Sequence, residues 1–461
     1  MMRDVLVIGG GISGLTAAYD LMRRGLDVAV LERQVVTGGK ALSSRFGGYL
    51  MEHGPSTLNV SAADALARLQ DLDLLDSAGD LGPNVRKRYL VDRRGLQGIS
   101  TSPAGFMLSN YLSLPGRISM AAEVLRPRKK DSAEESIFDF SRRRFGAEFA
   151  QKVIDPMAAG LFMGDSRALS IEGAFPKLPE MEQRFGSVVR GVLRAKKNSE
   201  PGRKLYSWAG GIGTIPKTLT RLLGDRVQTG VVVTGLAKIP GGFRVQTATG
   251  GQVARAVVLA VQPHVVADLL HGLEPLTAAA AAEIPAPAIG VVYLGYRTDQ
   301  IGHPLDGLGF LSTRNAGKTV SGAQFCSTMF QGRAPAGHVS ISCYTGGARH
   351  PEQADMPDAE LEQKVQAELA GLLDIKGPPV LVRTRRWAVG LPQYTLGHRE
   401  RRAVLETAHE RLEGLYLTGN YLQGVSVSNC MASAGAVAAQ VGDYLAANPQ
   451  ENPTEARPAS F

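Results

Sequence analysis

Five positions near the start of the chain have the residue types and the spacing that bind a pyrophosphate. Gly9, Gly11 and Gly14 form the pattern G-x-G-x-x-G, with Ile12 and Ser13 between the last two glycines. The first glycine allows a sharp turn, the second lets the backbone approach the phosphates, and the third lets helix and strand pack closely. The N-terminus of the following helix favours negative charge. We therefore predict that this turn binds a dinucleotide.

An acidic residue at the end of the next strand supports this prediction. Glu32 lies 18 residues beyond Gly14, where a carboxylate can accept hydrogen bonds from an adenosine ribose. Arg33 follows it, and a later strand-like run extends from Val231 to Val233. We expect Glu32, Arg33 and Val232 to contact the nucleotide.

Further glycine-rich segments distinguish between the two common dinucleotides. Gly39 and Lys40 follow closely after Glu32, and Gly54-Pro55 comes next. A nicotinamide nucleotide needs no second phosphate loop here, whereas FAD lies extended across the fold and requires one. Lys40 can offset phosphate charge.

The C-terminal part of the chain supplies a third glycine-rich segment. A strand there ends at Gly419-Asn420, and Val425 and Val427 lead into a helix. Backbone N–H groups at such a turn can reach a flavin ring or its ribityl chain. We therefore predict FAD as the cofactor.

The remaining candidates for chemistry are few. The three cysteines have no metal-ligand or redox spacing, so we expect buried thiols and no metal site. His53 and His398 are interpreted as structural residues. No side chain is predicted to be catalytic, because a flavin supplies the redox chemistry itself.

The elements around these residues predict an α/β fold. Residues 4–33 have the apolar periodicity of strand, helix and strand, residues 104–200 have helical spacing, and strands return beyond them. We expect a Rossmann-like FAD domain interleaved with a mixed α+β substrate domain and an inserted all-helical domain. The expected boundaries are 1–83, 223–284 and 396–447 for the FAD domain, 84–103, 205–222 and 285–395 for the substrate domain, 104–204 for the helical domain, and 448–461 for a disordered tail.

Basic residues are concentrated in the middle of the chain. Residues 84–130 contain ten Lys or Arg against two Asp or Glu, residues 184–204 contain seven against one, and the whole chain has a net charge of +8. This distribution favours an anionic membrane surface or an anionic substrate, with a solvated basic face left open. A secretory signal is not expected, because a core strand begins at Val5.

With these residues noted, the chain resembles the protoporphyrinogen oxidase family, within the wider amine oxidase and phytoene desaturase superfamily. The resemblance covers roughly residues 4–445. Beyond the glycine motifs it is carried by several stretches in the family's order: Lys87-Arg88-Tyr89, Gly160 to Ser170, Phe325 to Phe330, Arg386-Trp387, Gly390 to Tyr394 with Gly397-His398, and Gly419-Asn420-Tyr421.

The resemblance implies oxygen-dependent oxidation of protoporphyrinogen IX to protoporphyrin IX in haem biosynthesis, with six electrons removed in three flavin cycles. It implies that Arg88 pairs with a substrate propionate, that Phe325 and Leu311 lie on the two faces of the macrocycle, and that Gly160 lines the same site. The expected partners are a tetrapyrrole, dioxygen and a membrane surface, with a homodimer left open and no nucleic acid.

The resemblance also implies a cytoplasmic protein attached peripherally to the inner face of the cell membrane through the helical domain. The apolar residues predicted to make that contact are Phe106, Met107, Leu108, Tyr111 and Leu112.

Three alternatives stay open at this point. The first keeps the fold and takes coproporphyrinogen III, whose four carboxylates suit the basic segment. The second is a carotenoid desaturase or amine oxidase, although Tyr421 alone does not form the aromatic cage typical of amine oxidases. The third is a flavin-binding scaffold without activity.

Overall fold

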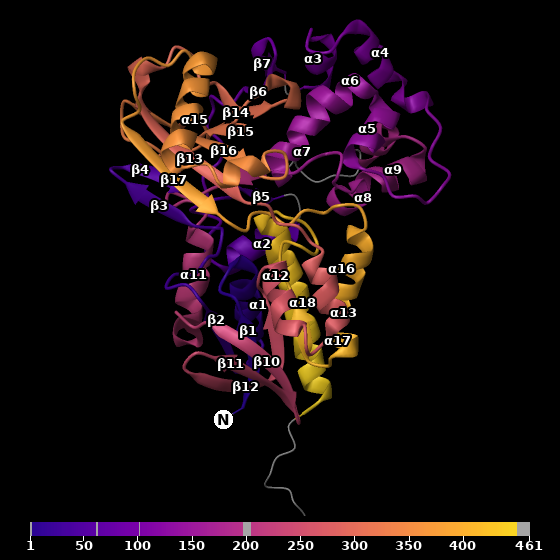
Figure 1. Cartoon of the computed structure of the whole chain (residues 1–461), viewed down its shortest axis with the longest axis vertical. Helices are drawn as coiled ribbons and strands as arrows, with labels where there is room; N and C mark the ends of the chain where they lie inside the picture. The colour runs from indigo at the N-terminus through magenta and orange to yellow at the C-terminus, as the bar shows by residue number, and fades with distance from the viewer. Residues whose placement is uncertain (1, 61–62, 101, 197–203, 450–461) are drawn as a thin grey trace, which may run out of the picture.

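The computed structural model describes residues 2–60, 63–100, 102–196 and 204–449. Figure 1 shows a lower body that contains the N-terminus, and above it a sheet on one side and a group of helices on the other. Residues 450–461 of the predicted disordered tail, and residues 197–203 of the predicted helical domain, lie outside the described residues.

The lower body is built on the first sheet, whose strands come from three distant parts of the chain. Its order is β10 (Val233–Ile239), β11 (Gly242–Thr247), β12 (Gly250–Leu259), β1 (Arg3–Ile8), β2 (Val28–Glu32) and β9 (Val227–Thr229), with β18 (Leu415–Leu417) paired to β12. The central pairs β1–β2, β1–β12, β2–β9 and β12–β18 are parallel, and β10, β11 and β12 form an antiparallel meander.

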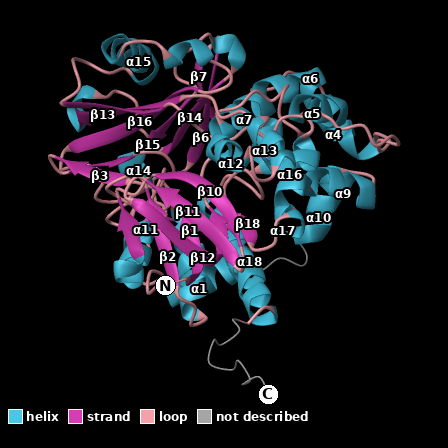
Figure 2. Ribbon diagram, turned by 60° about the horizontal axis from the view of Figure 1, so that its bottom comes forward, coloured by secondary structure: helices cyan, strands magenta, loops and turns pink. Residues whose placement is uncertain are grey.

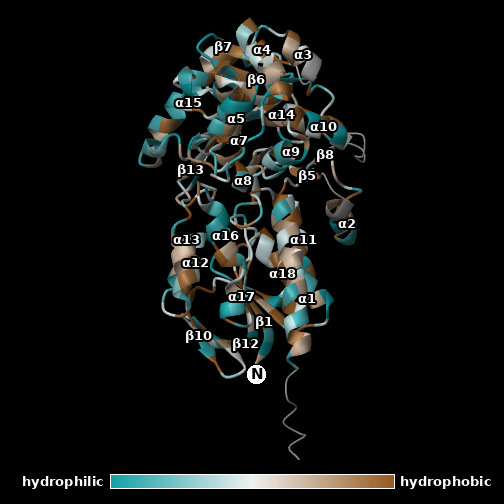
Figure 3. Cartoon of the chain, turned by 90° about the vertical axis from the view of Figure 1, so that its right-hand side faces the viewer, coloured by the Kyte–Doolittle hydropathy of each residue, from teal (hydrophilic) through white to brown (hydrophobic). Residues whose placement is uncertain are grey.

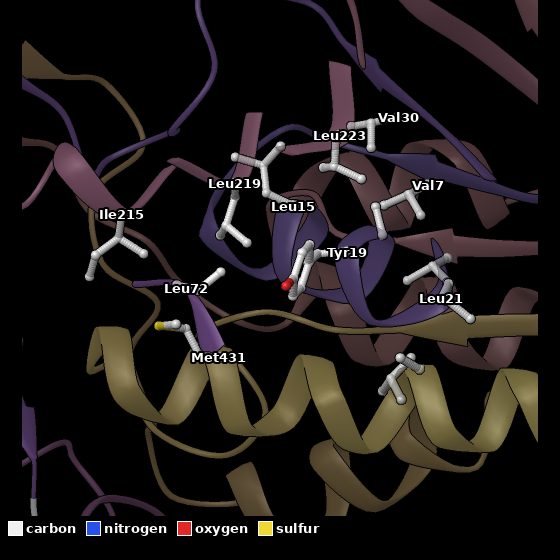
Figure 4. Packing of buried hydrophobic residues seen from close by; sticks show 14 of the residues in the cluster. Val7, Leu15, Tyr19, Leu21, Val30, Leu72, Ile215, Leu219, Leu223 and Met431 are labelled. Atoms are coloured by element: carbon white, nitrogen blue, oxygen red, sulfur yellow. The ribbon is translucent and has the colours of Figure 1, made fainter. Parts of the chain in front are cut away.

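Alternation along β1 explains the layers on either side of this sheet. Val5 and Val7 pack in one apolar cluster, and Leu6 and Ile8 pack in another. Figure 4 shows the first cluster from close by, with Val7 among side chains of the helices on that face. That face is covered by α1 (Ile12–Arg23), α2 (Ala63–Asp71), α11 (Thr214–Leu223) and α18 (Val427–Ala447). The other is covered by α12 (Pro263–Leu270), α13 (Pro275–Ala282), α16 (His398–Glu406) and α17 (Ala408–Arg411).

The strand expected over Val231 to Val233 is wrong in its bounds. β9 ends at Thr229 and β10 begins at Val233. The chain turns at Gly230 (φ +72°) because β9 and β10 are the strands at opposite edges of the sheet.

The second sheet forms the upper body. Its order is β17 (Leu381–Trp387), β13 (Ile289–Arg297), β16 (His338–Gly346), β15 (Gly322–Phe325), β14 (Gly307–Ser312), β6 (Lys87–Asp92) and β7 (Gly95–Ile99). All neighbours are antiparallel except β14 and β6. One face is covered by α15 (Asp358–Leu373), whose buried Leu361, Val365, Leu369 and Leu373 recur every four residues, as expected for one side of a helix.

Short elements complete the two bodies. They are β3 (Ser43–Phe46) paired with β4 (Tyr49–Glu52), β5 (Leu58–Val60) paired with β8 (Lys204–Tyr206), α14 (Cys326–Met329), and the 3-10 turns Gly224–Arg226, Thr298–Gln300, Arg314–Ala316 and Pro351–Ala354.

The helical insertion, defined here as residues 103–196, lies beside both sheets (Figure 2). It consists of α3 (Pro103–Leu108), α4 (Leu114–Ala121), a 3-10 turn (Ala122–Leu125), α5 (Ile137–Phe145), α6 (Ala147–Phe149), a π turn (Ala150–Ile154), α7 (Asp155–Phe162), α8 (Ile171–Ala174), α9 (Lys177–Phe185) and α10 (Val188–Lys196). At its centre, Arg144 and Glu123 pair with both side chains 0% exposed. No described helix is long and apolar enough to cross a membrane.

Part of the predicted membrane contact is wrong. Tyr111 and Leu112 are buried against β6 and β7. Leu108 is 80% exposed. The reason is that the chain leaves α3 after Leu108 and turns inward, so residues only three or four apart in sequence face opposite ways. The predicted fold class, a mixed α/β protein, is confirmed, whereas the domain boundaries stay predictions.

Candidate cofactor and substrate site

The turn between β1 and α1 has the geometry of an anion-binding site. Gly9 has φ +108°, and a Cβ on Gly14 would lie 1.9 Å from the carbonyl oxygen of Gly9. A Cβ on Gly11 would meet no atom within 4 Å, so the space in front of that glycine is open. α1 begins at Ile12 with no side-chain cap, so the N–H groups of its first turn can bind an external anion.

Glu32 is the last residue of β2, and its carboxylate links the glycine turn after β1 to the segment that follows β2. Its carboxylate accepts hydrogen bonds from the backbone N–H groups of Gly10 and Gln34, both at 2.7 Å. A carboxylate has about four acceptor positions, so these two bonds leave room for a ribose hydroxyl. The N–H of Val231 donates to the carbonyl of Glu32 at 2.9 Å, and Val232, which follows, is half exposed. The predicted nucleotide contacts Glu32 and Val232 therefore lie side by side.

The second glycine-rich loop lies against the first. A Cβ on Gly39 would be 3.3 Å from the Cα of Gly11, and a Cβ on Gly54 would be 2.9 Å from the carbonyl oxygen of Lys40. Burial, and secondly the positive charge of Arg33, lower the pKa of the Lys40 ammonium to about 8. A bound phosphate would oppose both effects. The loop therefore places the Lys40 ammonium close to the open turn at Gly11, with the Arg33 guanidinium nearby.

The C-terminal loop between β18 and α18 has a fixed shape. A Cβ on Gly419 would lie 2.5 Å from the ring of Tyr421, and Gly424 has φ +110°. Ser426 caps α18, because its side chain accepts a hydrogen bond from the N–H of Asn429 at 3.1 Å. Two of these positions accept only glycine, so the path of the loop is determined by its sequence.

The two helix N-termini meet beside this loop. Ser13 forms a hydrogen bond with Cys430, whose thiol pKa burial raises to about 11 despite that bond. Val427 belongs to the same apolar cluster as the residues that contact Ile12. The predicted contacts Asn420 and Val425 are half-buried on the same loop, and Pro55 is half-buried on the loop after β4. The fold thus brings the three predicted cofactor segments to one end of the first sheet.

One face of the second sheet carries most of the predicted substrate residues. Arg88 on β6 lies opposite Ile99 of β7, and Leu311 on β14 lies beside Leu90 of β6. Since alternate residues of a strand share a face, Arg88, Leu90 and Leu311 lie on one face. A Cβ on Gly160 of α7 would lie 2.3 Å from Cδ2 of Leu311, so the helix reaches this face. Arg88 is exposed, and its side chain has no hydrogen bond or ion pair with any residue that the structure describes.

The prediction that Phe325 and Leu311 lie on two sides of one ligand is wrong. Phe325 is 0% exposed, and its ring centre is 6.3 Å from that of Tyr89 and 5.8 Å from that of His303. Tyr89 alternates with Arg88 along β6, so Phe325 lies on the opposite face, in the cluster covered by α15. The cause is strand register, which turns Phe325 into the core.

Aromatic residues that sequence reasoning did not assign join this face to the cofactor segments. The hydroxyl of Tyr344 lies 3.0 Å from Oε1 of Gln324 and 3.3 Å from the carbonyl oxygen of Gly54. The indole N–H of Trp387 donates to the carbonyl of His53 at 2.7 Å. Trp387 belongs to a stretch that carried the resemblance, but nothing in the sequence indicates these bonds. Through them, the face of Leu311 adjoins the loop of Gly54.

Of the two histidines interpreted as structural, His53 is half-buried and His398 is buried. Nε2 of His53 is 2.8 Å from Oγ of Ser44. Burial, together with Arg401 and Arg402, lowers the pKa of His398 to about 4, so its imidazole is neutral at physiological pH. Within the described part of the chain, no group of three His, Cys, Asp or Glu side chains could hold a metal ion.

The family model described as flavin containing amine oxidoreductase matches residues 12–442. The chain belongs to the flavin-containing amine oxidoreductase family. Two curated relatives are each 30% identical to it: protoporphyrinogen oxidase 1, chloroplastic, of Spinacia oleracea, matched over 96% of this chain and 84% of that one, and coproporphyrinogen III oxidase of Propionibacterium freudenreichii subsp. freudenreichii, over 96% and 92%. A solved structure from Exiguobacterium sp. 255-15, provisionally named a protoporphyrinogen oxidase, has a TM-score of 0.82 at 22% identity and covers 96% of this chain and 99% of that one.

As a member of the flavin-containing amine oxidoreductase family, the protein is an FAD-dependent oxidase. The residues present fit FAD. The open space at Gly11 and the uncapped start of α1 suit its pyrophosphate, and the Lys40 ammonium lies in the adjoining loop. The prediction of FAD from the glycine-rich segments is therefore confirmed, whereas the contact of each single residue stays a prediction.

Proposed function

We propose that the protein oxidises protoporphyrinogen IX to protoporphyrin IX, with dioxygen as the final electron acceptor. The observation that carries this proposal is Arg88, an exposed guanidinium without a partner in the described chain, on the same face as half-buried Leu311 and the apolar cluster of Leu90, Tyr111 and Leu112. A planar guanidinium suits a propionate carboxylate, and the apolar side chains suit a large flat ring system. The curated relatives that act on porphyrinogens support the same substrate class.

The side chains of this protein bind and orient, and the redox chemistry comes from the cofactor. Bound FAD accepts two electrons at a time, so removal of six electrons takes three rounds of reduction and reoxidation. Arg88 would hold one propionate and thereby set how far the macrocycle extends towards the Gly54 loop. Gly160 would leave room for the ring beside Leu311, because any side chain there meets Leu311.

The alternative substrate, coproporphyrinogen III, has support from the relative of Propionibacterium freudenreichii. It carries four carboxylates, and one unpaired arginine on an apolar face suits the substrate with fewer charges. Rates of porphyrin formation from the two porphyrinogens, measured side by side by fluorescence with purified protein, decide between them. A higher kcat/KM with coproporphyrinogen III than with protoporphyrinogen IX would overturn the proposed substrate.

The test of the binding site is the variant Arg88→Ala. Loss of one charge-assisted hydrogen bond costs about 1.5–3 kcal/mol, so kcat/KM should fall about 10- to 150-fold, mainly through KM. The matched control is Lys87→Ala, because Lys87 is the neighbouring cation on β6 and pairs with Asp306 at 2.9 Å, away from the face of Leu311. Equal kinetics for Arg88→Ala and the wild type would exclude the proposed anchor.

We also propose that the protein attaches peripherally to the inner, anionic face of the cell membrane through the helical insertion. Its exposed large apolar side chains include Leu108, Leu114, Ile118, Leu125 and Leu193. Exposed cations accompany them at Arg128, Lys130, Arg190 and Arg194. α3 and α4 lie at the end of the molecule opposite the N-terminus (Figure 3). Apolar area and basic charge together are the combination that binds anionic lipid surfaces.

A further inference from the structure

One buried tyrosine outside the predicted sites contacts the C-terminal loop. Tyr394 is 1% exposed and lies between β17 and α16. Its hydroxyl donates to the carbonyl of Asn420 at 2.6 Å and accepts from the N–H of Gly424 at 2.8 Å. One side-chain oxygen therefore joins both ends of the turn from Asn420 to Gly424.

The ring of the same tyrosine contacts the helical insertion. The centre of the Tyr394 ring is 6.0 Å from that of Phe162, the last residue of α7. Both side chains belong to the apolar cluster inside the insertion. The backbone carbonyl of Tyr394 also accepts the N–H of Ser170 at 2.7 Å. Gly160, which the structure places against Leu311, lies two residues before Phe162 on α7. Tyr394 is thus a direct physical link between α7 and the loop.

The surroundings hold this side chain in one position. His398 stacks on the ring, with centres 4.1 Å apart and planes 9° from parallel. Burial raises the pKa of the Tyr394 hydroxyl above its ordinary value, so the hydroxyl keeps its proton and remains a donor to Asn420. Position 424 requires glycine, because a Cβ there would lie 2.0 Å from Nδ2 of Asn429. Since the Tyr394 hydroxyl bonds both ends of the turn, a change at Tyr394 acts on both ends at once.

We propose that Tyr394 is a positioning residue that sets the 419–425 loop, and with it the flavin, relative to α7. Occupation of the face beside α7 then changes how firmly FAD is held, and bound FAD changes affinity at that face by the same factor, because such coupling is reciprocal. The part of the proposal that concerns the porphyrin rests on the function proposed above. The part that concerns FAD does not.

The experiment compares Tyr394→Phe with the control Tyr293→Phe. Both tyrosines are buried and donate to a backbone carbonyl, but Tyr293 lies on β13 of the second sheet and donates to the carbonyl of Arg333, at 3.1 Å, in the loop before β16. Each apoprotein is titrated with FAD, and the visible circular dichroism of the holoprotein is recorded. For Tyr394→Phe we expect a Kd for FAD about tenfold above that of the wild type and an altered flavin spectrum. The control should keep both. An unchanged Kd and spectrum in Tyr394→Phe would overturn the proposal.

A second measurement examines the link to α7. Protoporphyrin IX is added to the holoprotein, and the rate at which FAD dissociates is followed. The wild type should release FAD more slowly with the porphyrin, whereas Tyr394→Phe and Phe162→Leu should show little difference. Phe162→Leu keeps both hydroxyl bonds of Tyr394, so its Kd for FAD should stay near that of the wild type. An undiminished effect of the porphyrin in both variants would overturn the link. If porphyrin has no effect on the wild type, the coupling between the face beside α7 and FAD is overturned. If Tyr394→Phe still weakens FAD binding in that case, the positioning of the loop by Tyr394 stands, and the comparison of the two porphyrinogens tests the substrate separately.

Discussion

Two glycines of the first turn allow ligand binding to be separated from folding. Gly11 and Gly14 lie three residues apart at the start of α1, and alanine at either position adds a single methyl group. At Gly11 this methyl group enters open space, whereas at Gly14 it enters the backbone of the turn. The same substitution is therefore expected to act on the cofactor in one case and on the fold in the other.

The cost of each change to the fold follows from the local geometry. Gly11 has φ −76° and ψ −179°, which any residue adopts, and its Cβ would meet no atom within 4 Å. A less favourable helix cap and a less flexible unfolded chain each contribute about 0.5–1 kcal/mol with opposite signs, so the stability should hardly change. At Gly14 the methyl carbon would lie 1.9 Å from the carbonyl oxygen of Gly9 and 3.0 Å from Cβ of Ala260. Moving backbone apart at such a contact costs about 3 kcal/mol.

The variant that hardly changes stability, Gly11→Ala, is the one expected to weaken the binding of FAD directly. The methyl group of Gly11→Ala occupies the space through which a pyrophosphate would approach the N–H groups of α1. Each charge-assisted hydrogen bond that is lost costs about 1.5–3 kcal/mol, which corresponds to a Kd about 10- to 150-fold higher.

The assay uses apoprotein prepared by removing FAD. Thermal unfolding without FAD reports the fold, and fluorescence titration with FAD reports binding. Gly11→Ala should have a Tm within about 2 °C of the wild type and a much weaker affinity for FAD. Gly14→Ala should unfold at a clearly lower temperature even without FAD. If Gly11→Ala bound FAD as the wild type does, the start of α1 would not be the pyrophosphate site.

Three other predictions concern single features. Because folding lowers the pKa of Lys40 from 10.5 to about 8, the unfolded chain binds more protons between these pH values. The apoprotein should therefore gain stability as the pH rises through this range while its affinity for FAD falls, and Lys40→Met should flatten both pH profiles. Gly160→Ala should raise KM for the porphyrinogen several-fold with a Tm change below about 2 °C, because higher helix propensity and the displaced Leu311 side chain each contribute about 1 kcal/mol in opposite directions. The double variant Leu114→Asp, Ile118→Asp should no longer sediment with anionic vesicles, with neutral vesicles as the control.

The features that sequence reasoning predicted correctly are local ones. The turn from Gly9 to Gly14 is a short motif whose geometry depends on neighbours within the same strand and helix, so its residue types suffice to recognise it. The same holds for β1, α1 and β2, whose apolar periodicity is visible in the sequence.

The features that sequence reasoning missed depend on pairing between distant segments. Whether Phe325 points towards Leu311 or towards α15 is decided by the register of β15, and a shift of one residue reverses it. The burial of Tyr111 depends on how the insertion packs on β6 and β7. The role of Tyr394 depends on bonds to residues 26 and 30 positions away. No local pattern contains this information.

The order of strands in the first sheet has a consequence for how the protein is made. β1 is synthesised about 250 residues before its parallel neighbour β12, and β18 and α18 come after residue 414. Pairing between such distant segments is slow, and exposed strand edges promote aggregation meanwhile. The second sheet and the helical insertion are synthesised before the first sheet can close. We predict that the 419–425 loop and α18 complete the cofactor site, so the growing chain should not capture its flavin before α18 has been synthesised, and a stop before residue 415 should yield a product that does not bind FAD.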